Sequence, residues 1–279
     1  MKRSVSHKKI LEKIFSSRNF EGLIPYTKAC EWRSMSNEER ELLASLFVMQ
    51  GEKHLDVGDS KVLESFKLAN DVAPNCPIVM YRQALAFAKQ NQNAFCLRAA
   101  SKVFEKVLEA KPNFFDARHG WANAQVLLGE CISEMDPFHQ ALHLFSTTEG
   151  LADKVSSTKL AAFYRDWGVC WHSLGKLSGE AYDFRKSLEV FHKASKYGQN
   201  ASQFWIDYGN SVMELSALVG KPEILLEAVE LYWKAVKLAP HHSKGWMNLA
   251  TSLQLIYQYQ PQESYFTLAD ESFDQVAKL

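Results

Sequence analysis

The sequence predicts an all-α chain built from repeated antiparallel helix pairs, and two spacings carry this prediction. Ala228 and Tyr232 stand four residues apart, which places a small residue and a ring on one face of a helix. Ala269 and Phe273 repeat the motif forty-one residues downstream. A further small residue, Gly209, precedes Ala228 by nineteen residues and sits in a separate amphipathic stretch. Each repeat therefore needs two helices, which we call helix A and helix B.

The motif of helix B occurs seven times along the chain. Its rings are Tyr26, Phe66, Phe104, Phe145, Phe191, Tyr232 and Phe273. The residues four positions before them are Gly22, Val62, Ala100, Ala141, Ser187, Ala228 and Ala269. The residues three positions after them are Ala29, Ala69, Val107, Thr148, Ala194, Ala235 and Val276. All these flanking residues are small or compact, so each copy predicts the packed face of one helix.

The motif of helix A precedes the last six copies and supplies a large residue followed by a small one. Its small residues are Ala44, Ala84, Ala122, Gly168, Gly209 and Ala250. Two helices cross closely only where small side chains let the backbones approach, and a ring then fills the space beside them. A lone pair cannot bury its apolar face, whereas stacked pairs bury it continuously. The spacing therefore predicts a solenoid.

The two motifs together resemble the tetratricopeptide (TPR) pattern, W-x2-L-G-x2-Y…A-x3-F…P. The residues that match it best are Trp246, Leu249, Ala250 and Leu253 in helix A, and Ala228, Tyr232, Ala235 and Pro240 in helix B. The resemblance extends from about Gly22 to the end of the chain. It implies a TPR-like right-handed α-solenoid of antiparallel helix pairs, with about six to seven repeats.

The repeat is longer here than in the family. The best copies of helix A begin at Tyr164, Trp205 and Trp246, forty-one residues apart, whereas the family repeat has 34 residues. The difference corresponds to about two helical turns, so we expect each helix to gain one turn where A meets B. The helix breakers at these junctions are "DVGDS" from Asp56, "EMDP" from Glu134, "VGKPE" from Val219 and "YQPQE" from Tyr259.

We expect one solenoid domain over residues 1–279. Residues 1–35 are expected to form a divergent N-terminal helix pair, "SHKKILEKIFSS" followed by a helix over Gly22–Cys30. Residues 36–279 are expected to form six lengthened repeats, beginning at a capping box of Ser36 and Glu39. Solenoids usually need a polar cap, and the sequence stops inside the last helix B. We therefore expect a truncated last repeat or a covering partner.

Composition disfavours several classes of function. The formal net charge is zero, whereas proteins that bind nucleic acids or anionic membranes usually carry a basic face. No window approaches eighteen uninterrupted apolar residues, so we expect no membrane span. The five cysteines are scattered and form no CxxC pair, which favours free thiols in a reducing compartment. We expect a cytoplasmic protein.

The sequence offers no catalytic constellation. GxGxxG, GxxxxGK[ST] and GxSxG are absent. His139 and His143 have a spacing that can hold a metal. Ala141 and Phe145 are expected on the packed side of that helix, so we prefer to interpret the two histidines as a surface pair. We expect no enzyme, no metal and no cofactor. The tryptophans of helix A, which are expected to be core rather than ligand-stacking residues, are Trp121, Trp167, Trp171, Trp205 and Trp246.

In TPR solenoids the A helices line the concave groove. The resemblance implies that the groove residues, repeat by repeat, are His119, Asn123 and Val126; Arg165, Val169 and His172; Ile206, Asn210 and Met213; and Met247, Thr251 and Gln254. Some relatives clamp a C-terminal carboxylate with Lys and Asn. Asp166 stands where Asn would be needed in that repeat, which argues against such a clamp.

The function expected from these observations is a non-enzymatic interaction scaffold or adaptor that binds a peptide or helix of a partner protein in its concave groove. One alternative is a chaperone or assembly helper for secreted proteins. Another is the regulatory TPR domain of a larger enzyme that continues beyond residue 279. Nucleic-acid binding is disfavoured by the zero net charge. The sequence leaves the partner and the oligomeric state open.

Overall fold

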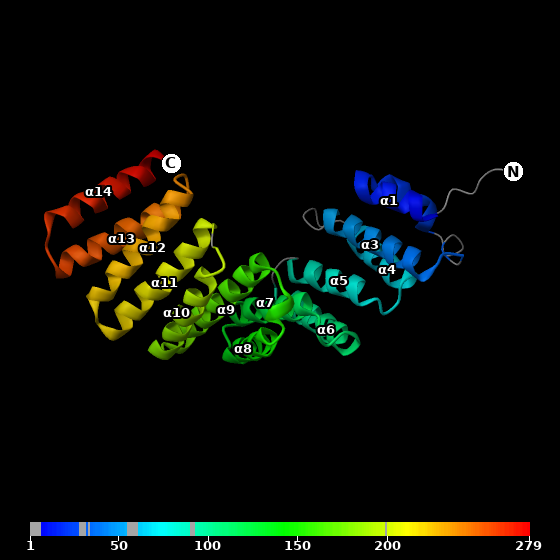
Figure 1. Cartoon of the computed structure of the whole chain (residues 1–279), viewed down its shortest axis with the longest axis horizontal. Helices are drawn as coiled ribbons and strands as arrows, with labels where there is room; N and C mark the ends of the chain where they lie inside the picture. Colours follow the sequence, from blue (N-terminus) through cyan, green and yellow to red (C-terminus); the bar gives the residue numbers. More distant parts are fainter. Residues whose placement is uncertain (1–6, 28–31, 33, 55–60, 90–92, 199) are drawn as a thin grey trace. The chain divides into compact units, whose positions relative to one another are not determined.

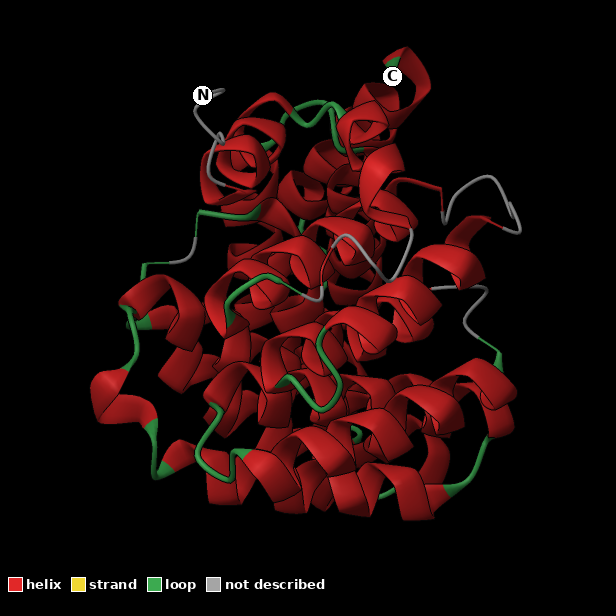
Figure 2. Cartoon of the chain, turned by 90° about the vertical axis from the view of Figure 1, so that its right-hand side faces the viewer, coloured by secondary structure: helices red, strands yellow, loops and turns green. Residues whose placement is uncertain are grey.

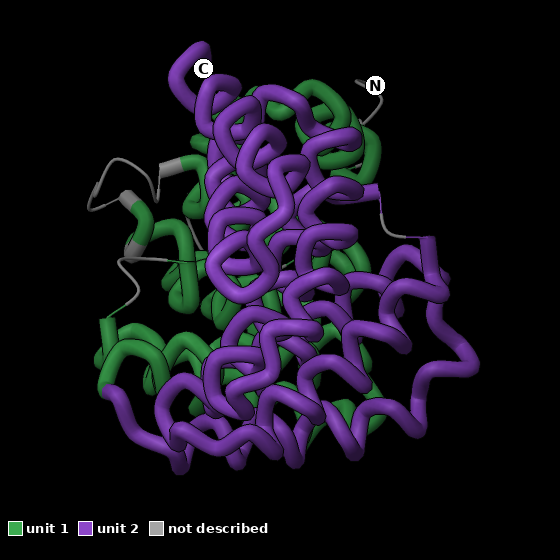
Figure 3. Tube along the Cα trace, turned by 90° about the vertical axis from the view of Figure 1, so that its left-hand side faces the viewer, with its two compact units in different colours: residues 1–132 green, residues 133–279 purple. Residues whose placement is uncertain are grey.

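The computed structural model describes residues 7–27, 32, 34–54, 61–89, 93–198 and 200–279. All regular secondary structure in these residues is helical (Figure 2), which confirms the predicted all-α class. The chain forms two compact units, Met1–Ile132 and Ser133–Leu279 (Figure 3). The boundary falls between helix A and helix B of one repeat.

The first unit is a row of antiparallel helices (Figure 1). Its elements are α1 (His7–Ser17), the 3-10 helix η1 (Phe20–Thr27), α3 (Asn37–His54), α4 (Lys61–Val72), α5 (Pro77–Lys89), α6 (Ala94–Ala110) and α7 (Phe115–Ile132). Helix α3 packs on α4, α5 packs on α6, and α6 packs on α7. The A helices α3 and α5 also touch, as consecutive repeats of a solenoid should.

The second unit continues the same arrangement. Its elements are α8 (Met135–Glu149), η3 (Ala152–Lys154), α9 (Ser157–Ser178), α10 (Ala181–Ser195), α11 (Ser202–Val219), η4 (Pro222–Ile224), α12 (Leu225–Leu238), α13 (Ser243–Tyr259) and α14 (Glu263–Lys278). Each helix from α8 to α13 packs on the helix that follows it. The A helices α9, α11 and α13 make direct contacts in sequence order.

The signals expected at the helix ends are largely confirmed. The Ser36 and Glu39 side chains exchange hydrogen bonds with each other's backbone N–H groups at 2.9 and 3.3 Å, which is the predicted capping box. The junctions at Glu134 and Tyr259 separate consecutive helices. Gly220 ends α11 with a left-handed φ of 64°, a conformation that glycine adopts at little cost. The junction from Asp56 to Ser60 lies outside the described residues.

The N-terminal helix pair differs from its prediction. Helix α1 forms as expected, but residues 20–27 form a 3-10 helix with Pro25 inside it. Proline lacks a backbone N–H and disfavours the α-helical conformation of the residue before it, so an α-helix cannot run through this stretch unbroken. Residues 28–30 lie outside the described residues.

Packing of small residues against rings confirms the basis of the repeat. A Cβ atom placed on Gly209 would lie 2.6 Å from the Tyr232 ring, and one on Gly168 would lie 3.0 Å from the Phe191 ring. Gly51 and Gly175 stand in the same relation to Phe66 and Phe184, a pairing that the motif analysis missed. The small repeat residues are buried: Ala44, Ala84, Ala100, Ala122, Ala141, Gly168, Gly209, Ala228, Ala250 and Ala269.

The rings that fill these spaces are mostly buried as well. Phe104, Phe145, Phe191 and Tyr232 are inaccessible to solvent, whereas Phe273 in the last helix is half-buried. Phe145 meets Phe163 of α9, and Phe191 meets both Gly168 of α9 and Phe204 of α11. The buried residues of the first unit form two successive clusters, one around Phe47 and Phe66 and one around Phe104, rather than a single central core.

The tryptophans do not all lie in the core. Trp167 is buried and stacks on Phe145 with 6.0 Å between ring centroids. Trp205 and Trp246 are half-buried, which corrects the expectation that they fill the core. Trp205 faces the Lys234 ammonium, and the Trp246 indole N–H donates to the Pro240 carbonyl at 2.8 Å. Their polar N–H groups and large rings suit the edge of the stack, where one end is apolar and the other meets water.

Half-buried tryptophan side chains also occur on α7 and α9. Trp121 and Trp171 resemble Trp205 and Trp246 in exposure. The core positions in α11 are filled instead by Phe204 and Tyr208, whose rings lie 5.7 and 5.4 Å from that of Phe191. The residue one position before the tryptophan therefore packs inward. Phe204 and Tyr208 pack on α10 of the preceding repeat, whereas Gly209 meets Tyr232 of its own repeat as predicted.

Candidate partner-binding surface

The predicted groove residues of the first unit lie on α7. His119 and Asn123 are half-buried, and the His119 Nε2 and Asn123 Nδ2 atoms are 3.4 Å apart. The His119 ring meets the Phe115 ring edge-on. Val126 is only 6% exposed, so it belongs to the core and not to an accessible groove. His119 and Asn123 thus remain the accessible candidates on this helix.

Arg165 is committed to an internal ion pair. Its Nε and Nη2 atoms donate to one carboxylate oxygen of Asp207 at 3.1 and 2.7 Å, and Asp166 lies 3.5 Å from its Nη1. The other oxygen of Asp207 accepts from the Gln203 amide at 2.7 Å. This network joins the A helices α9 and α11. Sequence reasoning missed Asp207, whose charge opposite to Arg165 on the neighbouring A helix was the only available signal.

His172 lies between helices rather than in an open groove. Its Nδ1 atom is 2.9 Å from the Ser211 hydroxyl oxygen, which is 3.0 Å from that of Ser187. The Ser187 hydroxyl donates to the Gly168 carbonyl at 2.8 Å. Burial lowers the pKa of His172 to about 4, with a further contribution from the charge of Lys176. The imidazole is therefore neutral near pH 7. It takes part in a chain of hydrogen bonds that joins α9, α10 and α11.

Ile206 and Asn210 also face neighbouring helices. Ile206 is 2% exposed and lies 3.8 Å from where a Cβ atom on Gly245 would stand, so it packs against α13. The Asn210 side-chain oxygen accepts from the Tyr232 hydroxyl and from the Asn248 amide, both at 2.9 Å. Ile206, like Val126, is therefore corrected from a groove residue to a core residue. Asn210 ties three helices together.

The remaining candidates of the second unit have accessible side chains. Met247 is 43% exposed, Gln254 is exposed, and Met213 and Thr251 are half-buried. The Thr251 hydroxyl donates to the Met247 carbonyl of its own helix at 2.9 Å. Val169 on α9 is half-buried. The open part of the surface formed by the A helices thus lies mainly on α11 and α13.

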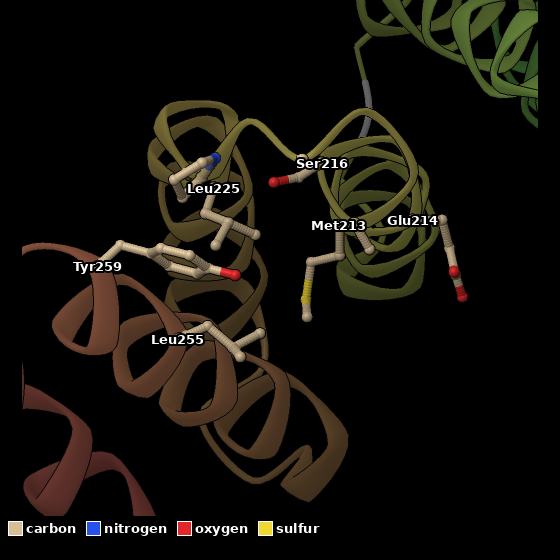
Figure 4. Close-up of a pocket in the computed structure, with 9 residues that line it drawn as sticks. Met213, Glu214, Ser216, Leu225, Leu255 and Tyr259 are labelled. Carbon is tan, nitrogen blue, oxygen red and sulfur yellow. The ribbon is translucent and has the colours of Figure 1, made fainter.

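A hollow of about 230 Å³ lies between the ends of these two helices. It is lined by Met213, Glu214, Ser216, Ala217, Gly220, Pro222, Leu225, Leu255 and Tyr259. In Figure 4, Leu255 and Tyr259 extend from α13 toward the space that Met213 enters from α11. Leu225 of α12 is 4% exposed, whereas Tyr259 is 63% exposed. The hollow therefore has an apolar base and an open aromatic edge.

The structure shows how the local sequence builds the hollow. Gly220 ends α11, and Pro222 begins the short helix η4, so the chain turns sharply before α12. The Ser216 hydroxyl donates to the Lys221 carbonyl at 2.8 Å and holds this turn closed. Only Met213 among the lining residues was predicted from the sequence. The others were missed because they come from the end of α11, from the turn that leads into α12 and from the end of α13, which lie outside the repeat motif.

The described residues hold no group of three or more His, Cys, Asp and Glu side chains that could bind a metal ion. His139 and His143 are both exposed on α8. None of the described helices has the length and apolar character needed to cross a membrane.

Comparison with solved structures identifies known proteins that share this fold. No family model matches the chain, and no curated protein matches its sequence. Among solved structures, the C-terminal part of a TPR repeat-containing protein from Cytophaga hutchinsonii matches with a TM-score of 0.62 at 12% identity, covering 97% of this chain and 94% of that one. TTC0263, a TPR protein of Thermus thermophilus, matches at 0.52 and 17% identity, covering 78% and 100%.

A third match is YrrB, described as a TPR protein with an unusual peptide-binding site. Its TM-score is 0.50 at 18% identity, and the match covers 76% of this chain and 91% of that one. At these identities the likeness establishes the fold and nothing further. The arrangement of helix pairs predicted from the repeat motifs is confirmed.

Proposed function

We infer that this chain, which has the fold of TPR proteins, is a non-enzymatic scaffold or adaptor that binds a peptide or helical segment of a partner protein on its A helices. The hollow at Met213, Leu255 and Tyr259 carries the proposal, because it offers an apolar base beside an exposed ring. Its volume of about 230 Å³ is several times the roughly 30 Å³ that one water molecule occupies in the liquid. A bulky apolar side chain of a partner fits such a space.

The surroundings of the hollow suit a polypeptide ligand. Ligand sites combine an apolar lining with a few polar groups that set orientation, and here Glu214 supplies a carboxylate in the lining beside Met213. Met213 and Met247 have flexible side chains that adapt to irregular apolar partners. A helix or extended segment anchored by spaced apolar residues is recognised in this way. The peptide-binding site of YrrB supports peptide binding as a use of this fold.

The test is selection of peptides from a random library on the purified chain, followed by affinity measurement with fluorescence anisotropy. We expect the selected peptides to share a bulky apolar residue. Tyr259→Ala and Met213→Glu should each weaken their binding by at least about tenfold, as loss of a central anchor contact does. Leu238→Glu on α12 is the matched control, because Leu238 is 47% exposed but does not line the hollow.

Two results would count against the proposal. One is a set of peptides without a shared apolar residue, and the other is unchanged binding by both variants at the hollow. A chaperone of secreted proteins, or a regulatory domain of a larger enzyme, would use the same surface. The identity of a captured natural partner distinguishes those roles from an adaptor.

A further inference from the structure

The Glu214 carboxylate lies beside the hollow and has no basic partner among the residues that the structure describes. Glu214 lines the hollow next to Met213 and is half-buried. No described Lys, Arg or His side chain lies within ion-pair distance of its carboxylate oxygens. A half-buried charge loses part of its hydration, so a cation supplied by a bound partner would be favourable here.

The neighbouring A helix shows what kind of partner is missing. Two helical turns earlier on α11, Asp207 lies on the same side of the helix as Glu214 and pairs with Arg165 of α9 at 2.7 Å. Two turns after Arg165, α9 carries His172 instead of a second Arg or Lys. This imidazole is neutral near pH 7, because burial lowers its pKa to about 4, and it lies 2.9 Å from the Ser211 hydroxyl oxygen. Glu214 therefore has the acidic position of a pair whose basic position is unfilled.

Glu214 is also placed where a bound segment can reach it. It follows Met213 directly, so the two side chains diverge by about 100° around α11. Figure 4 shows Met213 directed from α11 toward Leu255 and Tyr259, with Glu214 on the adjoining side of the helix. That side also carries Asp207, whose partner is on α9, so it belongs to the surface formed by the A helices. A segment whose apolar residue enters the hollow can extend across this side of α11.

The helix ends around the hollow favour a cation as well. Helices α11 and α13 both end beside the hollow, so both present the negative ends of their dipoles there. In the turn between α11 and α12, Glu223 and Lys221 are both exposed and offset each other. Helix α13 carries only Lys244, at its opposite end, and Lys176 in the last turn of α9 lies outside the lining. Glu214 is therefore the one charged residue in the lining of the hollow.

We propose that the partner segment carries a Lys or Arg side chain near the apolar residue that enters the hollow, and that this cation pairs with Glu214. This specificity rests on the function proposed above, namely peptide binding at the hollow. The long stems of Lys and Arg are apolar, so such a side chain can lie across α11 while its charged end reaches the carboxylate. An acidic segment would place its charge against Glu214 and against two negative helix ends, which disfavours it. The surface therefore selects basic, amphipathic segments.

The test uses the tightest-binding peptide from the library selection, with fluorescence anisotropy as the measurement. We expect this peptide to contain a Lys or Arg within about four residues of its bulky apolar residue. Replacement of that basic residue by Gln should weaken binding by about threefold, as loss of a partly exposed ion pair does. Glu214→Gln should weaken binding of the original peptide by the same factor and should leave binding of the Gln-containing peptide unchanged. Added NaCl should weaken the original complex more than either altered complex.

Charge reversal gives a sharper result. Glu214→Lys should weaken binding of the basic peptide by at least about tenfold, because it brings like charges together. The same variant should bind well a peptide in which the basic residue is replaced by Glu. Glu230→Lys on α12 is the matched control, because Glu230 is exposed and does not line the hollow, so this variant should keep the preference of the wild type. Circular dichroism confirms that each variant is folded.

The outcomes separate this specificity from peptide binding itself. Selected peptides that share an apolar residue and depend on Tyr259, but lack a basic residue, would overturn the specificity and leave the proposed function standing. Equal affinity of the basic peptide for the wild type, Glu214→Gln and Glu214→Lys would do the same. A selection that yields no binding peptide, or only peptides that bind independently of Met213 and Tyr259, would overturn both.

Discussion

The Tyr232 hydroxyl donates a 2.9 Å hydrogen bond to the side-chain oxygen of Asn210, while its ring occupies the space that a Cβ atom on Gly209 would need. One tyrosine thus fills the apolar gap at a helix crossing and also satisfies the polar group at its end. Burial raises the pKa of this hydroxyl well above its usual range, with a smaller contribution from Glu214. The small residue, the ring and the amide act as one packing unit.

Substitution of Gly209 should destabilise the fold. In Gly209→Ala the new Cβ meets a ring held on two sides, so the ring or the helix has to move, at a cost of about 1–3 kcal/mol. Gly209→Leu should cost several kcal/mol. Urea denaturation measures both. Gly150→Ala is the control, because a Cβ there meets only one backbone oxygen at 3.8 Å and should change stability little; a near-wild-type midpoint for Gly209→Leu would contradict the packing.

Asn210 should matter to stability more than a groove residue would. The sequence suggests that a polar surface substitution here spares the fold, but the structure places its oxygen between the Tyr232 hydroxyl and the Asn248 amide. Asn210→Leu should cost about 1–3 kcal/mol, because it leaves a buried hydroxyl without its acceptor. Gln254→Leu, at an exposed site on α13, is the matched control. Equal unfolding midpoints for the two variants would show that Asn210 faces solvent.

His172 should make the fold sensitive to acid. Its pKa is about 4 in the folded chain against an ordinary 6.5, so the unfolded chain binds the proton more readily between these values. Stability is therefore lost as pH falls from about 6.5 toward about 4, by up to about 3 kcal/mol. His172→Gln should reduce this loss when the free energy of unfolding is compared at pH 7 and pH 4.5. Parallel pH profiles for the two chains would rule out a buried neutral imidazole.

The ion pair between Arg165 and Asp207 should contribute only modestly to the free energy of unfolding. Both side chains are partly accessible, so solvent screens the pair and its removal should cost about 1 kcal/mol or less. A double-mutant cycle with Arg165→Met and Asp207→Asn measures the coupling free energy. Salt should reduce that coupling. A coupling free energy of zero at low salt would mean that α9 and α11 do not bring Arg165 and Asp207 into contact.

Part of this architecture could be predicted from the sequence because close helix crossings impose a local pattern. Gly209 and Tyr232 are recognisable since the small residue and the ring recur at fixed helical spacing. The roles of Arg165, His172 and Ile206 could not be predicted in the same way. Spacing identifies a helical face, but the crossing angle between neighbouring A helices decides how much of that face is covered.

The hollow was missed for a related reason. Pro222 and Tyr259 belong to the turn between helices and to the last turn of an A helix, where the repeat motif has no fixed positions. Trp205 likewise lies at the edge of the stack, because Phe204 and Tyr208 fill the core positions of α11. The repeat spacing alone does not tell which of the adjacent rings Phe204 and Trp205 is buried.

The most direct test of the account is a double-mutant cycle between Gly209 and Tyr232, read as the free energy of unfolding in urea. If the small residue exists to admit the ring, Gly209→Ala should cost about 1–3 kcal/mol in the wild-type chain and much less in a Tyr232→Ala background, where the ring is gone. The same cost in both backgrounds would contradict the packing of small residues against rings on which the stacked helix pairs depend.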